Sequence, residues 1–151
     1  MRGLVLRLAF AGLLGTAAIP PSAHAADAPP ANDAPDLRSV RAAVKAKKFD
    51  AALTELKVLV TKSNHPDVYS LMGFALRKTG DRPQAMIYYR KALDIAPMHK
   101  GALEYQGELF VELGQVDKAK ENLAKLRQVC LFGCEEFDDL KEAIEHALKA
   151  G

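Results

Sequence analysis

An internal repeat restricts the fold of this chain more than any other feature of its sequence. A pattern of glycines, alanines and large apolar residues runs from Tyr69 to Pro97 and recurs from Leu103 to Leu126. The matching pairs, all separated by the same offset, are Gly73 with Gly107, Leu76 with Phe110, Gly80 with Gly114, and Ala85 with Ala119. A period of about 34 residues is typical of proteins that stack pairs of helices, each pair burying its apolar face against its neighbours.

The small residues in each copy indicate where helices pack closely. We expect Gly73 and Gly107 at crossings that leave no room for a side chain, with Ala85 and Ala119 in the matching place on the second helix of each pair. Further along each copy comes another glycine, where a tight turn needs a left-handed backbone. Each copy therefore predicts a helix, a tight turn and a second helix.

At these residues the chain resembles the tetratricopeptide repeat family. Residues 66–97 look like one repeat and residues 100–130 like a second. A weaker copy around residues 49–52 lies just under one period upstream and carries Val40 in the place of the glycine, so its first helix is expected to pack less closely. The resemblance covers residues 36–130 and implies an all-α fold, an α-solenoid of about three helix pairs.

The helical pattern predicts seven helices and no strand. They are expected at residues 36–47, 50–62, 66–79, 82–95, 99–113, 116–130 and 135–149. The last helix has no partner, and it places Phe137, Leu140, Ile144 and Leu148 on one face. Because the end of a solenoid needs an element with one polar side, we expect this helix to be a C-terminal cap.

The N-terminus has the order of segments that a signal peptidase recognises. Arg2 and Arg7 give a basic start, Leu8 to Ile19 is an uncharged apolar run, and small residues follow. The apolar run has twelve residues, whereas a membrane-spanning helix needs about 20. We expect residues 1–25 to be a signal peptide that is cleaved before Ala26, which predicts a periplasmic protein; a retained membrane anchor is the alternative.

Residues 26–35 are predicted to be a disordered tether. They include three prolines and no large apolar residue, so they bury too little apolar surface to offset the entropy of ordering. Residues 36–149 are predicted to form a single helical repeat domain.

The charge of the mature chain argues against two classes of partner. The full sequence has 21 basic and 19 acidic residues, and residues 1–25 contain two arginines and no acid. The mature chain therefore has 19 of each and no net charge. Because a neutral domain lacks the field that gathers nucleic acid or an anionic membrane, we expect neither partner and no stable membrane insertion.

Cys130 and Cys134 are the only cysteines, and an oxidising compartment favours a disulfide between them. Such a bond would join the cap to the last repeat. Binding of a partner is expected to survive the loss of the bond, because the residues expected to face a partner, given below, lie on other helices. A redox dithiol usually has two intervening residues, covalent haem needs a histidine where Glu135 stands, and zinc needs two further ligands. A redox or metal role is kept as an alternative.

The three histidines outside the predicted signal peptide give little support to catalysis. His65 and His99 lie at junctions between repeats, where they are expected to cap helices, and His146 is expected to be solvated on the last helix. The sequence contains no phosphate-binding loop, nucleophile motif or metal-ligand spacing. We therefore expect no catalysis, no cofactor and no metal.

The resemblance implies a concave surface, formed by the first helix of each pair, that receives a peptide or a helix of another protein. By register, the facing residues would be Leu37, Arg41, Val44, Ser70, Phe74, Arg77, Glu104, Glu108 and Val111. Arginines are expected at one end and glutamates at the other, with Phe74 as an apolar middle. The family's carboxylate clamp is not carried over, because Phe74 and Glu108 stand where it would need asparagines. The alternative is that these charges are ordinary solvated groups.

These observations favour a non-catalytic periplasmic module that binds a protein or peptide partner on its concave face. One alternative is a carrier whose groove holds an apolar small molecule or lipid, and another is a redox or metal accessory that acts through Cys130 and Cys134. Three helix pairs are close to the minimum for a stable stack, which is also compatible with self-association through an exposed end.

Overall fold

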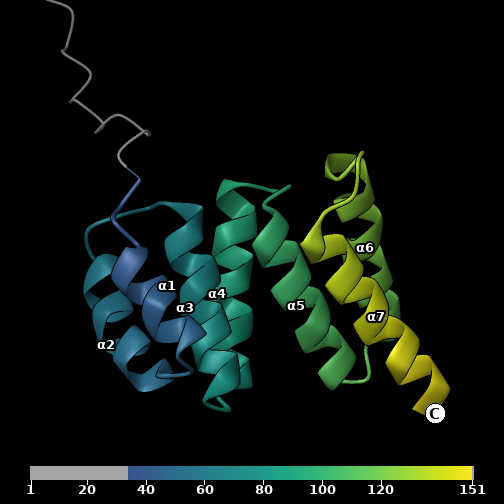
Figure 1. Ribbon diagram of the computed structural model, residues 1–151, viewed down its shortest axis with the longest axis horizontal. Coiled ribbons are helices and arrows are strands. Elements are labelled where there is room, and N and C mark those ends of the chain that lie inside the picture. The colour runs from purple at the N-terminus through teal and green to yellow at the C-terminus, as the bar shows by residue number, and fades with distance from the viewer. Residues whose placement is uncertain (1–33, 151) are drawn as a thin grey trace, which may run out of the picture. The chain divides into compact units, whose positions relative to one another are not determined.

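The computed structural model describes residues 34–150, and its seven α-helices follow one another side by side in chain order (Figure 1). Their bounds are α1 Arg38–Lys45, α2 Phe49–Leu59, α3 Pro66–Lys78, α4 Arg82–Ile95, α5 Lys100–Glu112, α6 Val116–Val129 and α7 Glu135–Ala150. The predicted bounds agree with these to within a helical turn. No strand occurs between residues 34 and 150, so the all-α prediction is confirmed.

The predicted signal peptide and most of the predicted tether lie outside the described residues. Export, cleavage before Ala26 and the periplasmic location therefore stay predictions. Within the part of the chain that the structure describes, none of the helices combines the length and the apolarity that crossing a membrane demands.

The helices pair as the repeat predicts. α1 packs on α2, α3 on α4 and α5 on α6. The first helices of the second and third pairs also touch, α3 with α5, and α5 touches the capping helix α7, so these helices line one side of the stack (Figure 1). α7 packs on both α5 and α6. The predicted α-solenoid with a C-terminal capping helix is confirmed.

The core is divided along the stack into clusters that neighbouring helices share. Leu56 lies in the cluster of α1, α2 and α3, Tyr89 in that of α4 and α5, and Leu140 in that of α5, α6 and α7. Each of these side chains is fully buried. This division is expected of a solenoid, because each helix pair makes contact only with its neighbours.

Gly73 and Gly107 both lie at close helix crossings, but their neighbours differ. A β-carbon at Gly73 would lie 2.5 Å from the ring of Tyr89 on α4, within the same helix pair. A β-carbon at Gly107 would lie 2.5 Å from Leu140, on the capping helix α7. In the next repeat Leu123 takes the place of Tyr89, and this shorter side chain leaves the space beside Gly107 to α7.

The first helix pair makes the same turn as the other two, with a lysine in place of the glycine. Lys47, which occupies the turn position of Gly80 and Gly114, has a positive φ of 58°, and the two glycines have φ values of 96° and 70°. The backbone bonds that close the three turns are Lys48 N–H to the Ala43 carbonyl at 2.9 Å, Asp81 to Leu76 at 2.9 Å, and Gln115 to Phe110 at 2.8 Å. The weak first copy is therefore a structural repeat, with a lysine in a backbone region that costs it about 1–2 kcal/mol.

The two junction histidines cap helices, as predicted. His65 Nδ1 accepts a hydrogen bond from the Asp67 backbone N–H at 3.3 Å, and His99 Nδ1 accepts one from Ala102 at 3.0 Å. His99 Nε2 also lies 2.7 Å from a carboxylate oxygen of Asp67, so the cap of α5 is tied to the first turn of α3. This tie between successive helix pairs was not apparent from the sequence.

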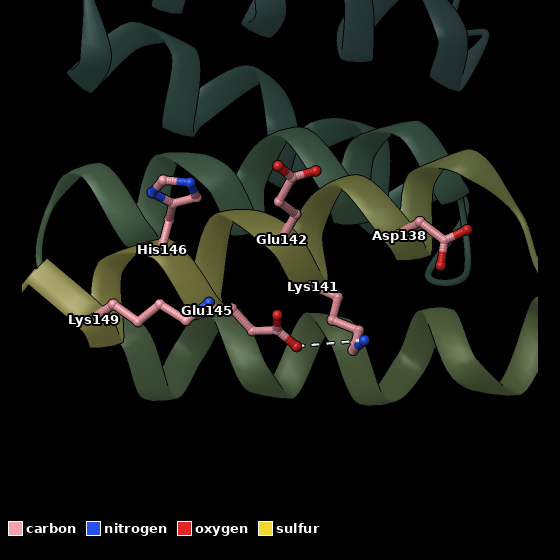
Figure 2. Close-up of a pocket in the computed structure, with 6 residues that line it drawn as sticks. All are labelled: Asp138, Lys141, Glu142, Glu145, His146 and Lys149. Atoms are coloured by element: carbon pink, nitrogen blue, oxygen red, sulfur yellow. Dashed lines mark ion pairs between the residues drawn. The ribbon is translucent and has the colours of Figure 1, made fainter.

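The capping helix α7 has an apolar side and a charged side. Leu140 and Ile144 are buried and Phe137 is half-buried, whereas Leu148, at the end of the same face, is 57% exposed. The charged side carries Asp138, Lys141, Glu142, Glu145, His146 and Lys149, with an ion pair of 3.4 Å between Lys141 and Glu145 (Figure 2).

Candidate functional site

The nine residues that register assigned to the concave surface lie in three different environments. Leu37, Val44 and Val111 pack against the apolar clusters of the core, so they do not belong to the candidate site. Ser70, Arg77 and Glu104 are buried polar residues, Phe74 and Glu108 are half-buried, and Arg41 is exposed. The remaining six lie on α1, α3 and α5, the helices that the register indicated.

Arg77 and Glu108 are bonded to each other, which corrects the expected separation of positive and negative ends. Arg77 reaches from α3 to α5, where it donates to Glu108 and, at 3.0 Å, to Glu112. Arg82 shares Glu112 at 2.9 Å. The Arg77 side chain is only 3% exposed, so it is not an ordinary solvated charge. A guanidinium at this depth needs its carboxylate partners, and this set joins two neighbouring helix pairs.

Phe74 lies in an aromatic contact beside this ion pair. Its ring centre is 4.7 Å from that of Tyr105 on α5 and 6.1 Å from that of Phe49 on α2. The amine of Lys78 lies 5.2 Å from the centre of the Phe74 ring, a distance at which a cation is attracted to an aromatic face. The apolar part of the surface that was expected at Phe74 is thus an aromatic pair formed by Phe74 and Tyr105.

Glu104 is the most unusual residue of the surface. It is only 7% exposed, and no side chain or backbone N–H between residues 34 and 150 donates a hydrogen bond to its carboxylate. Burial raises the pKa of Glu104 to about 8, and the negative charges of Glu108, Asp139 and Glu136 act in the same direction. The carboxyl group therefore holds a proton at neutral pH, in contrast to Arg77, whose charge is neutralised by partners.

A hollow of about 360 Å³ opens in front of Glu104, and we call it the acidic hollow. Its lining residues are Phe74, Lys78, Glu104, Tyr105, Glu108, Glu135, Glu136 and Asp139. Five carboxyl groups thus face one amine. Three of the five belong to α7, which the sequence analysis interpreted only as a cap. The acidic residues at the start of α7 were visible in the sequence. The packing of α7 against α5, which brings these residues to the hollow, was not.

A second hollow, of about 400 Å³, continues the first along α1, α3 and α5. The two hollows share Tyr105 and Glu136, so they adjoin, and we call the two together the groove. The charges of the second hollow are paired: Arg41 lies 2.7 Å from Asp67, and Lys100 lies 3.7 Å from Glu136. A hydrogen bond from His99 and the positive charges nearby hold the pKa of Asp67 below its usual range despite partial burial. The groove is therefore balanced at one end and strongly acidic at the other.

The structure joins Cys130 and Cys134 by a disulfide, with their α-carbons 5.5 Å apart. Together with Glu136 they are the one set of three metal-type ligands that lie close together among residues 34–150. Both sulfurs are in the disulfide, so this oxidised form offers no thiolate to a metal. The loop between the cysteines exposes Leu131 by 78% and Phe132 completely.

Comparison with known proteins agrees with the helix pairs described above. Residues 66–99 and residues 102–129 each match the family described as the tetratricopeptide repeat. The second helix pair falls within the first match, and the third pair falls within the second match except for the first two residues of α5.

Two curated proteins are similar to parts of the chain. One is the cellulose synthase 2 operon protein C of Komagataeibacter xylinus, 32% identical over 88 residues, which are 58% of this chain and 7% of that protein. The other is the BBSome complex member BBS4 of Bos taurus, 31% identical over 77 residues, which are 51% of this chain and 15% of that protein. The match thus spans a small part of either relative. The family matches and the three similar helix pairs together show that this chain belongs to the tetratricopeptide repeat family, whose repeats indicate an interaction with other proteins.

Proposed function

We propose that this protein is a non-catalytic interaction module of the periplasm that binds a segment of a partner protein along the groove of α1, α3, α5 and α7. The observation that carries the proposal is the pair of adjoining hollows, one with the paired charges at Arg41 and the other with Glu104, which share Tyr105 and Glu136. A segment that occupies both hollows would pass over Tyr105, which lines both.

Three further observations support this function. Helix repeats of this kind indicate protein partners, and one of the similar proteins is named as a member of a complex. The aromatic pair of Phe74 and Tyr105 offers a large contact area to a partner, and aromatic residues are enriched where binding energy is concentrated. The N-terminal pattern of residues 1–25 is the reason for placing the protein in the periplasm.

Capture of partners from a periplasmic extract tests the binding proposal. We expect the purified protein to retain a partner that the Phe74→Ala variant loses, because Phe74 lies in the groove. Ile95→Ala is the matched control: Ile95 is a large apolar residue at the end of α4, 48% exposed, and it is not part of the groove. Equal capture by all three proteins, each with an unchanged helical circular dichroism spectrum, would contradict binding in the groove.

Mass spectrometry of the protein recovered from the periplasm tests the location separately. We expect an N-terminus at or near Ala26, because cleavage should follow the small residues that end the apolar segment. Recovery of the mature species with Met1 intact would contradict the proposed signal peptide, and recovery only from the cytoplasm would contradict the periplasmic location.

A further inference from the structure

We propose that the acidic hollow receives a lysine or arginine side chain of the partner segment, with the cationic group between Glu104 and the carboxylates of α7 and the aliphatic stem against Phe74 and Tyr105. The inference rests on the proposed function, because it names the chemistry of the segment that the groove binds. The backbone of the segment would lie in the second hollow, whose charges are paired, and its lysine or arginine would enter the acidic hollow.

Glu104 has little exposed surface, but its carboxylate has no hydrogen-bond donor within residues 34–150. Its residue is 7% exposed and its carboxylate lines the hollow, yet it accepts no hydrogen bond within residues 34–150. Arg77, the nearest buried cation, already donates to Glu108 and Glu112. The oxygens of Glu104 are not fully buried, since the buried side-chain polar atoms without a partner within residues 34–150 are Arg77 Nε and Tyr89 Oη. A donor from outside the chain can therefore reach the carboxylate and supply the hydrogen bond that it lacks.

Charged groups on α3, α5 and α7 face Glu104. The facing groups are Arg77 and Lys78 on α3, Glu108 on α5, and Glu135, Glu136 and Asp139 on α7. Arg77 is occupied by its own ion pairs, and Glu136 is shared with Lys100. Glu135 and Asp139 make no ion pair within residues 34–150. The hollow is therefore negative in sum, and it attracts a cation.

The aromatic wall of the hollow suits the aliphatic part of a lysine or arginine side chain. Phe74 already has the guanidinium of Arg77 at 5.8 Å and the amine of Lys78 at 5.2 Å from its ring centre. The adjoining rings of Phe74 and Tyr105 provide an apolar surface along which the carbons of a lysine or arginine can pack. A volume of about 360 Å³ accommodates one long side chain.

A metal ion fits the hollow less well than an organic cation. The three carboxylates of α7 and the two of α5 do not bring three oxygens close enough to share an ion; within residues 34–150 only the disulfide sulfurs with Glu136 lie that close. Ammonium and guanidinium groups present several donors in different directions, and they can therefore bridge carboxylates that are further apart.

If a cation binds at Glu104, the affinity for that cation should depend on pH. Because burial raises the pKa of Glu104 to about 8, the free protein holds a proton there at neutral pH. A bound cation favours the ionised carboxylate, so binding releases this proton. One released proton makes the affinity rise up to tenfold per pH unit below about pH 8 and level off above it.

Titration of the purified protein with short peptides tests the inference. The probes are four acetylated and amidated peptides, Gly-Ser-Ala-X-Ala-Ser-Gly, in which X is lysine, arginine, glutamate or norleucine, the uncharged analogue of lysine. Chemical shift changes of backbone amides report the affinity and the place of binding. We expect the lysine and arginine peptides to bind beside Glu104 and Tyr105, and the other two to bind at least tenfold more weakly. Equal binding of the norleucine peptide would overturn the inference.

Two variants and a matched control locate the cation. Glu104→Gln should weaken binding of the lysine peptide and remove its dependence on pH between 6 and 8. Asp139→Asn should weaken binding without disturbing the core, since Asp139 is exposed at the rim of the hollow. Asp138→Asn is the control, because the neighbouring Asp138 lies on the charged outer side of α7 (Figure 2). An equal effect of the Asp138 and Asp139 variants, or a pH dependence unchanged by Glu104→Gln, would overturn the inference.

Two further arms separate this inference from its alternatives. Spermidine is added as a free cation; if it binds more tightly than the lysine peptide, the hollow serves a polyamine rather than a protein segment. A partner from the extract that is lost on Phe74→Ala but captured equally by Glu104→Gln and Asp139→Asn would leave the proposed function standing and refute the cation. A partner unaffected by all three variants would refute both.

Discussion

The crossing of α3 and α4 at Gly73 gives the sharpest test of the packing described here. In Gly73→Ala the new methyl group would lie 2.5 Å from the ring of Tyr89 and 3.1 Å from the carbonyl oxygen of Ala85. The ring is fully buried and the oxygen belongs to a helix backbone, so neither moves easily. Overpacking of a core costs about 1–3 kcal/mol, and the higher helix propensity of alanine returns up to about 1 kcal/mol. Taking the upper half of the first range, we expect a net loss of about 1–2 kcal/mol.

Thermal and urea unfolding of the variant measures this loss. For a domain of this size, about 1–2 kcal/mol lowers the Tm by about 4–8 °C. Gly101→Ala is the matched control in α5, because its methyl group would have no neighbour closer than 3.6 Å and should therefore leave stability unchanged or increase it. Gly107→Ala should also lower stability, because its methyl group would lie 2.5 and 2.7 Å from the two Cδ atoms of Leu140, a fully buried side chain. A Gly73→Ala protein as stable as Gly101→Ala would refute the close crossing.

Three further predictions concern single positions. Lys47→Gly should raise stability by about 1 kcal/mol in urea unfolding, because glycine adopts a φ of 58° without the steric cost that lysine bears. Because burial raises the pKa of Glu104 from 4.5 to about 8 in the folded protein, the stability of the wild type should fall as the pH rises from 5 to 8. The Tm of Glu104→Gln minus that of the wild type should therefore increase across this range. Phe132→Ser should change stability by less than about 0.5 kcal/mol in the same assay, because the Phe132 side chain is fully exposed.

The helix pairs were predictable because their signals are local and repeated. Gly80 and Gly114 mark the turns, Pro66 lies in the first turn of α3, and each helix has apolar residues at the spacing of a buried face. Two copies in register made the assignment secure. The first copy was weaker for the same reason: Lys47 gives no turn signal, although the backbone there makes the same bonds as at the glycines.

The polar contacts of the groove were not predictable from the register alone. Arg77 and Glu108 were placed on adjacent first helices, but whether two such side chains pair depends on the rotation of α3 against α5. The same holds for Glu104, whose burial depends on α7 lying across the end of α5. A repeat pattern indicates which residues share a face. It does not state which of them the next helix covers, and this decides whether a charge is solvated, paired or buried without a partner.

The disulfide is expected to affect both the stability of the protein and its binding of a partner, whereas the sequence predicted an effect on stability alone. Replacing Cys130 and Cys134 by serine should cost about 2 kcal/mol through the entropy of so small a loop, and so lower the Tm by roughly 5–10 °C. Binding was expected to survive, on the ground that the groove residues lie on other helices. In the structure, however, Glu135 and Glu136 follow Cys134 directly and line the acidic hollow.

The double Cys→Ser variant should therefore lose affinity as well as stability, because the bond fixes the first turn of α7 against α6 and with it one wall of the hollow. Titration with the lysine peptide well below the lowered Tm measures this effect, and Phe132→Ser, which keeps the bond, controls for a change in the loop alone. A several-fold weaker affinity of the double variant, with the affinity of Phe132→Ser unchanged, is the expected result. If the double variant melts earlier but binds the peptide as tightly as the wild type, the carboxylates at the start of α7 do not depend on the disulfide for their position.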